Sequence, residues 1–183
     1  MQNEQDKQKF GEALEDFSLA AIQGGTVSLS QTLAGKKGTV VVFWSGVCSH
    51  CVRYDNYLNT FEARRPELSL IAVASRHGET PEMIRATMAK RELTFTMVHD
   101  PGSVVAKKWF TQQTPRAFLV DAGRRLHYRG AIDNYKYPED PEHADYLGPA
   151  LDEFLRGEPV SKPETASYGC AIFSIYYILP KAL

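Results

Sequence analysis

The sequence predicts a single α/β domain organised around a buried strand, and three observations support this prediction. A β-branched and aromatic run, Val40 to Trp44, is apolar at consecutive positions, as in a strand that is buried on both faces. A second apolar run, Leu68 to Ala74, is reached through a segment with helical periodicity, which is the order of a right-handed parallel βαβ unit. A length of 183 residues with 43% hydrophobic content suits one domain with a substantial core.

The N-terminal part predicts an arm followed by a hairpin. Residues 1–9 are polar and have no apolar periodicity, so we expect a flexible arm. Short alternating runs at 17–19 and 27–29 flank Gly24 and Gly25, which is a hairpin signal. The chain then passes through a polar turn into the central strand.

Helices and strands alternate after the central strand. Tyr54, Leu58 and Phe61 recur at helical spacing, and Pro66 ends the helix that they predict. This helix begins directly after the central strand, so we expect reactive side chains in the turn between them to lie at its N-terminus.

A second helix is expected where Thr80 supplies an N-cap and Pro81 the first helical position. A strand at 94–98 follows it, and a short helix at 103–110 comes next. From the central strand to residue 110, strands and helices therefore alternate, as in α/β domains.

Proline positions set the boundaries in the C-terminal half. Because Pro cannot lie inside a central strand, Pro115 marks the start of a strand that continues to Asp121. The alternating run at 126–130 forms a hairpin with it. A final helix is expected to open at Pro149 and to end at Gly157.

The turn after the central strand carries two cysteines three apart, in Cys48-Ser49-His50-Cys51. At a helix N-terminus both sulfurs lie within one turn and can close a small disulfide. Backbone N–H groups and the helix dipole favour a thiolate at the first position, so we expect Cys48 to be the exposed nucleophile and Cys51 the resolving thiol. Three cysteines are too few for a disulfide scaffold, which favours a catalytic use.

Trp44 to Cys51, taken with Thr114-Pro115, resembles the thioredoxin fold and, more narrowly, the redoxin and TlpA-like thiol-disulfide oxidoreductases of the AhpC/TSA-redoxin superfamily. The resemblance covers residues 15–172. It implies a three-layer α/β fold with a central mixed sheet, helices on both faces, an N-terminal β-hairpin and a helix-strand insertion. It also implies thiol-disulfide exchange through a redox-active Cys48–Cys51 disulfide, with no other cofactor.

The resemblance further implies a substrate site. In thioredoxin-fold proteins the matching proline is cis and faces the dithiol, so Pro115 with Thr114 is expected to bind an extended substrate chain through its exposed backbone groups. Trp44 is expected to lie beside the disulfide and to contact the substrate.

His50 stands where thioredoxin-like reductants usually have proline, and it resembles the periplasmic oxidase DsbA at this position. A nearby imidazolium favours a thiolate, so we expect His50 to lower the pKa of Cys48 and to make the couple more oxidising than that of thioredoxin. The alternative is a solvated side chain with little effect.

Two further residues are candidates for roles in the reaction. Asp55 lies one helical turn after Cys51 and is a candidate proton shuttle, although a solvated surface acid is the simpler interpretation. Cys170 is a candidate third exchange thiol, with an intermolecular disulfide or a buried apolar position as alternatives. The β-prone run at 172–179 is expected to pack on the sheet or to pair with another subunit as a dimer.

Three other chemistries compete with disulfide exchange. A structural zinc site needs four ligands, and the sequence has no second Cys-x-x-Cys or His-x-x-His pair. A thiol peroxidase-like redoxin needs Pro-x-x-x-Thr-x-x-Cys, where this chain has Val41 and Ser45. A Cu(I)-binding metallochaperone would use the soft thiolates, but such carriers of this fold usually have wider cysteine spacing and a distant His. We therefore expect no metal.

Charge and composition indicate which partners, location and division of the chain to expect. The net charge of −1, with acids and bases interspersed, predicts no nucleic-acid partner, and the partners expected are protein or small-molecule thiols and disulfides with a redox partner protein. We expect no membrane span, and a cytoplasmic protein, or a periplasmic one if a leader has been removed. The predicted division is an arm at 1–9, a thioredoxin-like domain at 10–160 and a C-terminal tail at 161–183 that carries Cys170.

Overall fold

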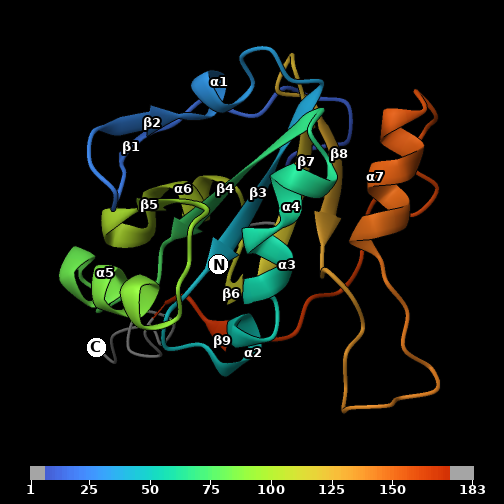
Figure 1. Ribbon diagram of the computed structural model, residues 1–183. Helices are drawn as coiled ribbons and strands as arrows, with labels where there is room; N and C mark the ends of the chain where they lie inside the picture. Colours follow the sequence, from blue (N-terminus) through green and yellow to red (C-terminus); the bar gives the residue numbers. More distant parts are fainter. Residues whose placement is uncertain (1–6, 174–183) are drawn as a thin grey trace, which may run out of the picture.

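The computed structural model describes residues 7–173 and contains a five-stranded mixed sheet with the strand order β5-β4-β3-β7-β8 (Figure 1). The first three strands in this order are parallel to one another, and β7 and β8 run antiparallel. The α/β class, the parallel βαβ unit and the mixed sheet are therefore confirmed. The strands are β3 (Gly38–Trp44), β4 (Leu68–Ala74), β5 (Thr96–His99), β7 (Arg116–Asp121) and β8 (Leu126–Gly130).

The central strand β3 is buried along its whole length. Alternate residues face opposite sides of the sheet, so Val40, Val42 and Trp44 enter one hydrophobic cluster while Val41 and Phe43 enter the other. This is the reason why the strand has no polar alternation. The fold therefore has three layers, with the sheet between two layers of helices and one hydrophobic core on each face of the sheet.

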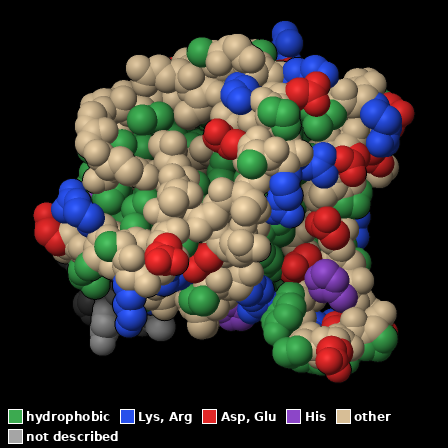
Figure 2. Space-filling view, viewed as in Figure 1, with side chains coloured by type: hydrophobic (Ala, Val, Ile, Leu, Met, Phe, Trp, Pro, Cys, Tyr) green, Lys and Arg blue, Asp and Glu red, His purple; other side chains and the backbone are tan. Residues whose placement is uncertain are grey.

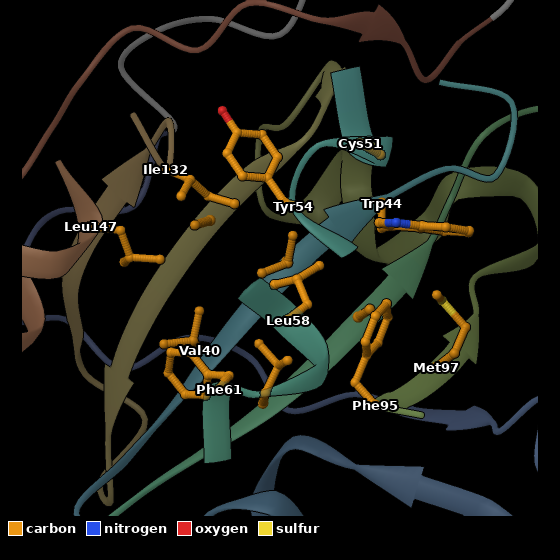
Figure 3. Packing of buried hydrophobic residues seen from close by; sticks show 14 of the residues in the cluster. Val40, Trp44, Cys51, Tyr54, Leu58, Phe61, Phe95, Met97, Ile132 and Leu147 are labelled. Atoms are coloured by element: carbon orange, nitrogen blue, oxygen red, sulfur yellow. The ribbon is translucent and has the colours of Figure 1, made fainter. Parts of the chain in front are cut away.

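Helices cover both faces of the sheet (Figure 1). The first face packs against α3 (Asp55–Asn59), α4 (Phe61–Arg64), α5 (Pro81–Lys90) and α7 (Leu147–Leu155). Figure 3 shows part of this core. The second face is covered by α1 (Leu29–Thr32), α6 (Val104–Lys108) and the chain around Leu14 and Phe17.

The predicted N-terminal hairpin is present as β1 (Ser18–Ala20) and β2 (Thr26–Ser28), paired antiparallel. Ser28 ends β2 and also caps α1, because its side chain accepts a hydrogen bond from the Gln31 N–H while the Gln31 side chain accepts from the Ser28 N–H. The hairpin is held to β5 through a bridge between Ala21 and Val98.

The helix that carries the dithiol is broken, which differs from the single helix expected from the sequence. It consists of α2 (Ser49–Val52), α3 and α4, with breaks at Tyr54 and Thr60. The Thr60 hydroxyl donates to the Asn56 carbonyl one turn earlier, and such back-bonding competes with a regular helix. The spacing of apolar residues gives no sign of these breaks, because Tyr54, Leu58 and Phe61 lie on one buried face whether or not the helix is continuous.

The final helix α7 begins at Leu147, two residues before the expected start at Pro149. Proline is therefore the third residue of the helix, where its missing N–H removes no intrahelical hydrogen bond. The helix ends at Leu155, and Gly157 follows with a positive φ of 76°, which is the conformation expected of glycine just beyond a helix.

Both ends of the described chain contact the domain. Residues 1–6 of the expected arm lie outside the described residues, but Lys7 pairs with Glu164 and the Gln8 carbonyl accepts a hydrogen bond of 2.7 Å from Arg129. At the other end, β9 (Cys170–Ala171) pairs with β6 (Gln113–Thr114). The run expected at 172–179 lies outside the described residues after Phe173.

The surface of the described chain is mixed in charge, and Figure 2 shows acidic and basic side chains interspersed over the face that carries α3, α4 and α7. Within residues 7–173, no helix has both the length and the apolar character needed to cross a lipid bilayer.

The insertion between β4 and β7 consists of α5, β5 and α6, and its first helix has the predicted cap. The Thr80 side chain accepts a hydrogen bond of 3.3 Å from the Met83 N–H, and Pro81 occupies the first turn. Ile84 and Met88 are the buried residues of this helix and pack on the first core.

Replacing Thr80 by Ala should lower the free energy of unfolding by about 1 kcal/mol, because one N–H of the first turn loses its acceptor. Thr80→Ser keeps a hydroxyl and should stay within a few tenths of a kcal/mol of the parent. Urea unfolding followed by far-ultraviolet circular dichroism measures both. Equal stability of the Ala variant and the parent would contradict the assigned cap.

Candidate active site

The dithiol lies at the end of β3, where the chain turns into α2. Cys48 is the N-cap residue of α2, with its own N–H bonded to the Ser45 carbonyl at 3.2 Å. Cys51 follows in the first turn, and its N–H donates to the Cys48 carbonyl at 3.0 Å. Both cysteines are thiols in this structure. The strand-turn-helix context predicted for the motif is therefore present.

The turn is held in place by two residues of the insertion. Glu79 accepts a hydrogen bond of 2.7 Å from the Gly46 N–H, and Arg91 donates one of 3.2 Å to the Gly46 carbonyl. Neither residue is marked by a pattern in the sequence. Glu79 is only 7% exposed in the structure, but the stretch around it is polar and gives no sign of burial.

Asp55 forms an ion pair with Arg91. Its two carboxylate oxygens accept from the Nε and Nη2 atoms of Arg91, forming a bidentate ion pair in which both side chains are 16% exposed. The same Arg91 reaches Gly46, so Asp55 positions the guanidinium that supports the turn. The role of Asp55 as a proton shuttle stays a prediction beside this structural role.

Cys48 is fully buried, which corrects the expectation that it is the exposed cysteine. Its thiol donates a hydrogen bond of 3.2 Å to the Thr114 carbonyl. Residues of the C-terminal tail, which we define as the described residues 161–173, complete the cover, because Cys170 lies opposite Thr114 in the β6–β9 pair. Because these covering residues are distant in the sequence, the burial of Cys48 could not be predicted from the Cys-x-x-Cys motif alone.

Thr114 and Pro115 lie beside the dithiol, as expected, and the peptide bond between them is cis. The Thr114 side chain is fully buried, whereas its backbone forms the edge that pairs with β9. Pro115 lines the cavity next to the site.

The three cysteines differ in acidity. A hydrogen bond with the Cys51 thiol is the main cause that lowers the pKa of Cys48 to about 4, with Cys170 and the Thr114 side chain adding to it against the opposing effect of burial. Burial raises the pKa of Cys51 well above its ordinary value, and the neighbouring Cys48 raises it further. Burial also raises the pKa of Cys170. Cys48 is therefore the thiolate of the site.

The stabilisation of the Cys48 thiolate expected from His50 stays a prediction, and the structure shows that the ring lies against Arg53. Its Nδ1 atom lies 3.0 Å from Nη2 of Arg53, and because a guanidinium can only donate, Nδ1 is the acceptor. The ring points toward Arg53 and lines the adjacent cavity. The hydrogen bonds that lower the pKa of Cys48 come from its sulfur neighbours and from Thr114.

Trp44 does not offer a substrate surface. Its side chain is fully buried, packs edge-to-face on Phe95 with ring centroids 6.5 Å apart, and lies under the Arg91 guanidinium. Figure 3 shows the indole lying over Phe95 and Met97, within the first core. The even-numbered residues of β3 point into the first core, and Trp44, the last residue of the strand, does so as well.

A cavity of about 630 Å³ adjoins the dithiol turn. Its walls come from α2, from the loop after β8 and from the C-terminal tail. Cationic and aromatic side chains meet there, with the Arg53 guanidinium 3.8 Å from the centre of the Tyr135 ring and the Lys162 amine 4.2 Å from that of Tyr146. We did not predict this wall from the sequence, although an aromatic and polar run follows β8.

Comparison with known proteins agrees with this geometry. The profile of the AhpC/TSA family matches residues 10–129. A thioredoxin-like protein from Haemophilus influenzae is 27% identical over 113 residues, a match that spans 62% of this chain and 65% of the relative's length.

Solved structures show the same fold. A hypothetical protein from Sinorhizobium meliloti 1021 superposes with a TM-score of 0.80 at 26% identity, over 91% of this chain and 94% of the other. A putative thiol:disulfide interchange protein DsbE from Chlorobium tepidum gives a TM-score of 0.60 at 22% identity, over 67% and 85% of the two chains. The fold is thus the thioredoxin-like fold of the redoxin and TlpA-like proteins.

The thiolate assignment predicts an unusual titration. Since only Cys48 has a lowered pKa, the ultraviolet absorbance of one thiolate should persist from about pH 8 down to about pH 5 and disappear near pH 4. The matching contribution to stability is complete above the ordinary pKa of 9.0 and is lost as the pH falls toward about 4. Cys48→Ser should remove the signal, and a thiolate signal that vanishes below about pH 8 would contradict the assignment.

Proposed function

Because the chain belongs to the AhpC/TSA family, we propose that it is a thiol-disulfide oxidoreductase with Cys48 as the nucleophile and Cys51 as the resolving thiol. The observation that carries the proposal is the position of two cysteine thiols in the first turn of α2, at the end of β3 and beside the Thr114–Pro115 peptide. The lowered pKa of Cys48 and the raised pKa of Cys51 agree with it. A stabilised thiolate next to a protonated thiol is the arrangement that disulfide exchange requires.

The proposed reaction has two steps. In the first, the Cys48 thiolate attacks one sulfur of a substrate disulfide, and the other substrate sulfur leaves as a thiolate and takes up a proton. This forms a mixed disulfide between Cys48 and the substrate. In the second, the Cys51 thiolate attacks Cys48 Sγ and releases the second substrate thiol. One substrate disulfide is reduced and one Cys48–Cys51 disulfide is formed, and the reverse sequence oxidises a substrate dithiol.

The timing of the second step follows from the charges at the site. Part of the rise in the pKa of Cys51 comes from the negative charge on Cys48. When Cys48 forms the mixed disulfide it loses that charge, so this contribution to the raised pKa of Cys51 disappears, while the larger contribution from burial remains. Formation of the mixed disulfide therefore favours the Cys51 thiolate.

An extended substrate chain would bind at the edge formed by Thr114. A strand that pairs with β6 gains backbone hydrogen bonds there, in the manner of strand addition to a sheet edge. The cavity beside Pro115, with Arg53, Tyr135 and Lys162, would accept neighbouring side chains of the substrate.

The structure gives less support to the peroxidase alternative. A peroxidase needs a hydroxyl in contact with the reactive sulfur, but Ser45 Oγ is buried and has no hydrogen-bond partner among the described residues. A Cu(I) carrier would use the Cys48 and Cys51 thiolates, and copper titration of the reduced chain separates this alternative from disulfide exchange.

Reduction of insulin disulfides with dithiothreitol as the electron donor tests the proposal. Cys48→Ser should lower the catalysed rate by at least about 100-fold, because no nucleophile remains. Ser49→Ala, an exposed position in the same turn, is the matched control and should keep the parental rate. A parental rate in Cys48→Ser would reject the assignment, and faster turnover of hydrogen peroxide than of insulin would favour the peroxidase instead.

A further inference from the structure

The C-terminal tail occupies the edge at which a substrate strand would bind. Strand β9 pairs antiparallel with β6, with Cys170 opposite Thr114 and Ala171 opposite Gln113. The Ile172 N–H donates to the Gln112 carbonyl at 2.9 Å and extends the pairing by one residue. In Figure 1 this strand, drawn in red, lies at the end of the sheet beside β6 and α2. The chain therefore supplies its own edge strand.

Anchors on both sides hold this strand in position. Before it, Arg129 pairs with both oxygens of Glu164 at 3.0 and 3.1 Å, and Thr165 Oγ1 accepts a hydrogen bond of 3.0 Å from the Ala131 N–H. After it, Ile172 is fully buried in the second core, and its carbonyl accepts a hydrogen bond of 2.9 Å from the His77 N–H. The tail is thus stretched across the dithiol.

Gly169 allows the close approach. A Cβ atom at this position would lie 1.9 Å from the Thr114 carbonyl oxygen, which is a backbone atom that cannot move aside cheaply. Any larger residue would push the strand away from β6. The absence of a side chain at 169 is therefore a steric requirement of the closed site.

The pairing brings a third sulfur to Cys48. Cys170 lies opposite Thr114 in the β6–β9 pair, and the Thr114 carbonyl accepts the hydrogen bond of 3.2 Å from the Cys48 thiol, so the two cysteines lie next to the same residue. The pKa values of the two thiols also depend on one another. We infer that residues 169–172 are an internal substrate strand and that Cys170 is a third redox thiol, which forms a disulfide with Cys48 and closes the site. This inference rests on the proposed disulfide exchange.

The exchange balances without an added reactant. Reduction of a substrate leaves the Cys48–Cys51 disulfide and a Cys170 thiol. The Cys170 thiolate attacks Cys48 Sγ, the Cys48–Cys51 bond breaks, and Cys51 leaves as a thiolate and takes a proton. One disulfide and one thiol are present before and after. Because Cys48 and Cys170 both lie next to Thr114 within one folded chain, the effective concentration of one thiol at the other exceeds that of thiols in solution.

The internal strand also indicates what an external substrate should look like. An extended peptide that replaces it must place a cysteine opposite Thr114, a residue with little or no side chain before that cysteine, and an apolar residue two positions after it, as Gly169, Cys170 and Ile172 do. The proposed substrate class is therefore a cysteine-containing extended segment of a protein.

A variant that isolates the new disulfide tests the inference. In Cys51→Ser, oxidised glutathione should convert the Cys48 and Cys170 thiols into one intramolecular disulfide with release of two molecules of glutathione, identified by mass spectrometry of non-reduced peptides. A product in which Cys48 carries glutathione and Cys170 stays reduced would overturn the inference. If the parent chain nevertheless forms Cys48–Cys51, the proposed function stands; if it forms no disulfide at Cys48, both fail.

A second variant leaves every sulfur in place. Gly169→Ala should displace β9 and increase the rate of Cys48 alkylation by iodoacetamide at least about tenfold in the reduced chain, because the cover opens more often. Ala171→Ser, whose side chain is exposed on the same strand, is the matched control and should leave the rate unchanged. Equal alkylation rates in Gly169→Ala and the parent would show that the strand does not close the site.

Discussion

One backbone group, the carbonyl of Thr114, joins the three parts of the chain on which the site depends. It accepts the hydrogen bond from the Cys48 thiol, and it faces Gly169 so closely that no side chain fits there. The dithiol turn, the β6 edge and the C-terminal tail therefore share a single point of contact. Changing any one of the three alters the environment of the reactive sulfur.

This arrangement makes the acidity of Cys48 a property of tertiary structure. The groups that lower its pKa belong to α2, to β6 and to β9, which are brought together only in the folded chain. A stabilised thiolate stabilises the reduced dithiol and so makes the couple more oxidising. The same contacts bury the Cys48 sulfur. The reactivity of Cys48 and its accessibility to a substrate therefore depend on the same three elements.

Local patterns in the sequence predicted the scaffold well, since each of its signals lies within one or two elements. The consecutive apolar residues of β3, the cap at Thr80 and the glycines of the hairpin all specify structure within a few residues. The site itself depends on distant partners. Asp55 meets Arg91 from 36 positions away, and Thr114 meets Cys170 from 56 positions away, so neither the ion pair nor the cover could be read from the motif.

Disulfide exchange at this site requires Cys48 and Cys51 to form a reversible disulfide, and the reduced form of the pair is stabilised at Cys48. Equilibration of the full chain with glutathione at graded ratios, followed by trapping of the remaining thiols, measures the potential of this couple directly. The contacts around Cys48 predict a potential above the value of about −270 mV that is typical of thioredoxin. A potential at or below that value, or no disulfide at any ratio, would contradict the account.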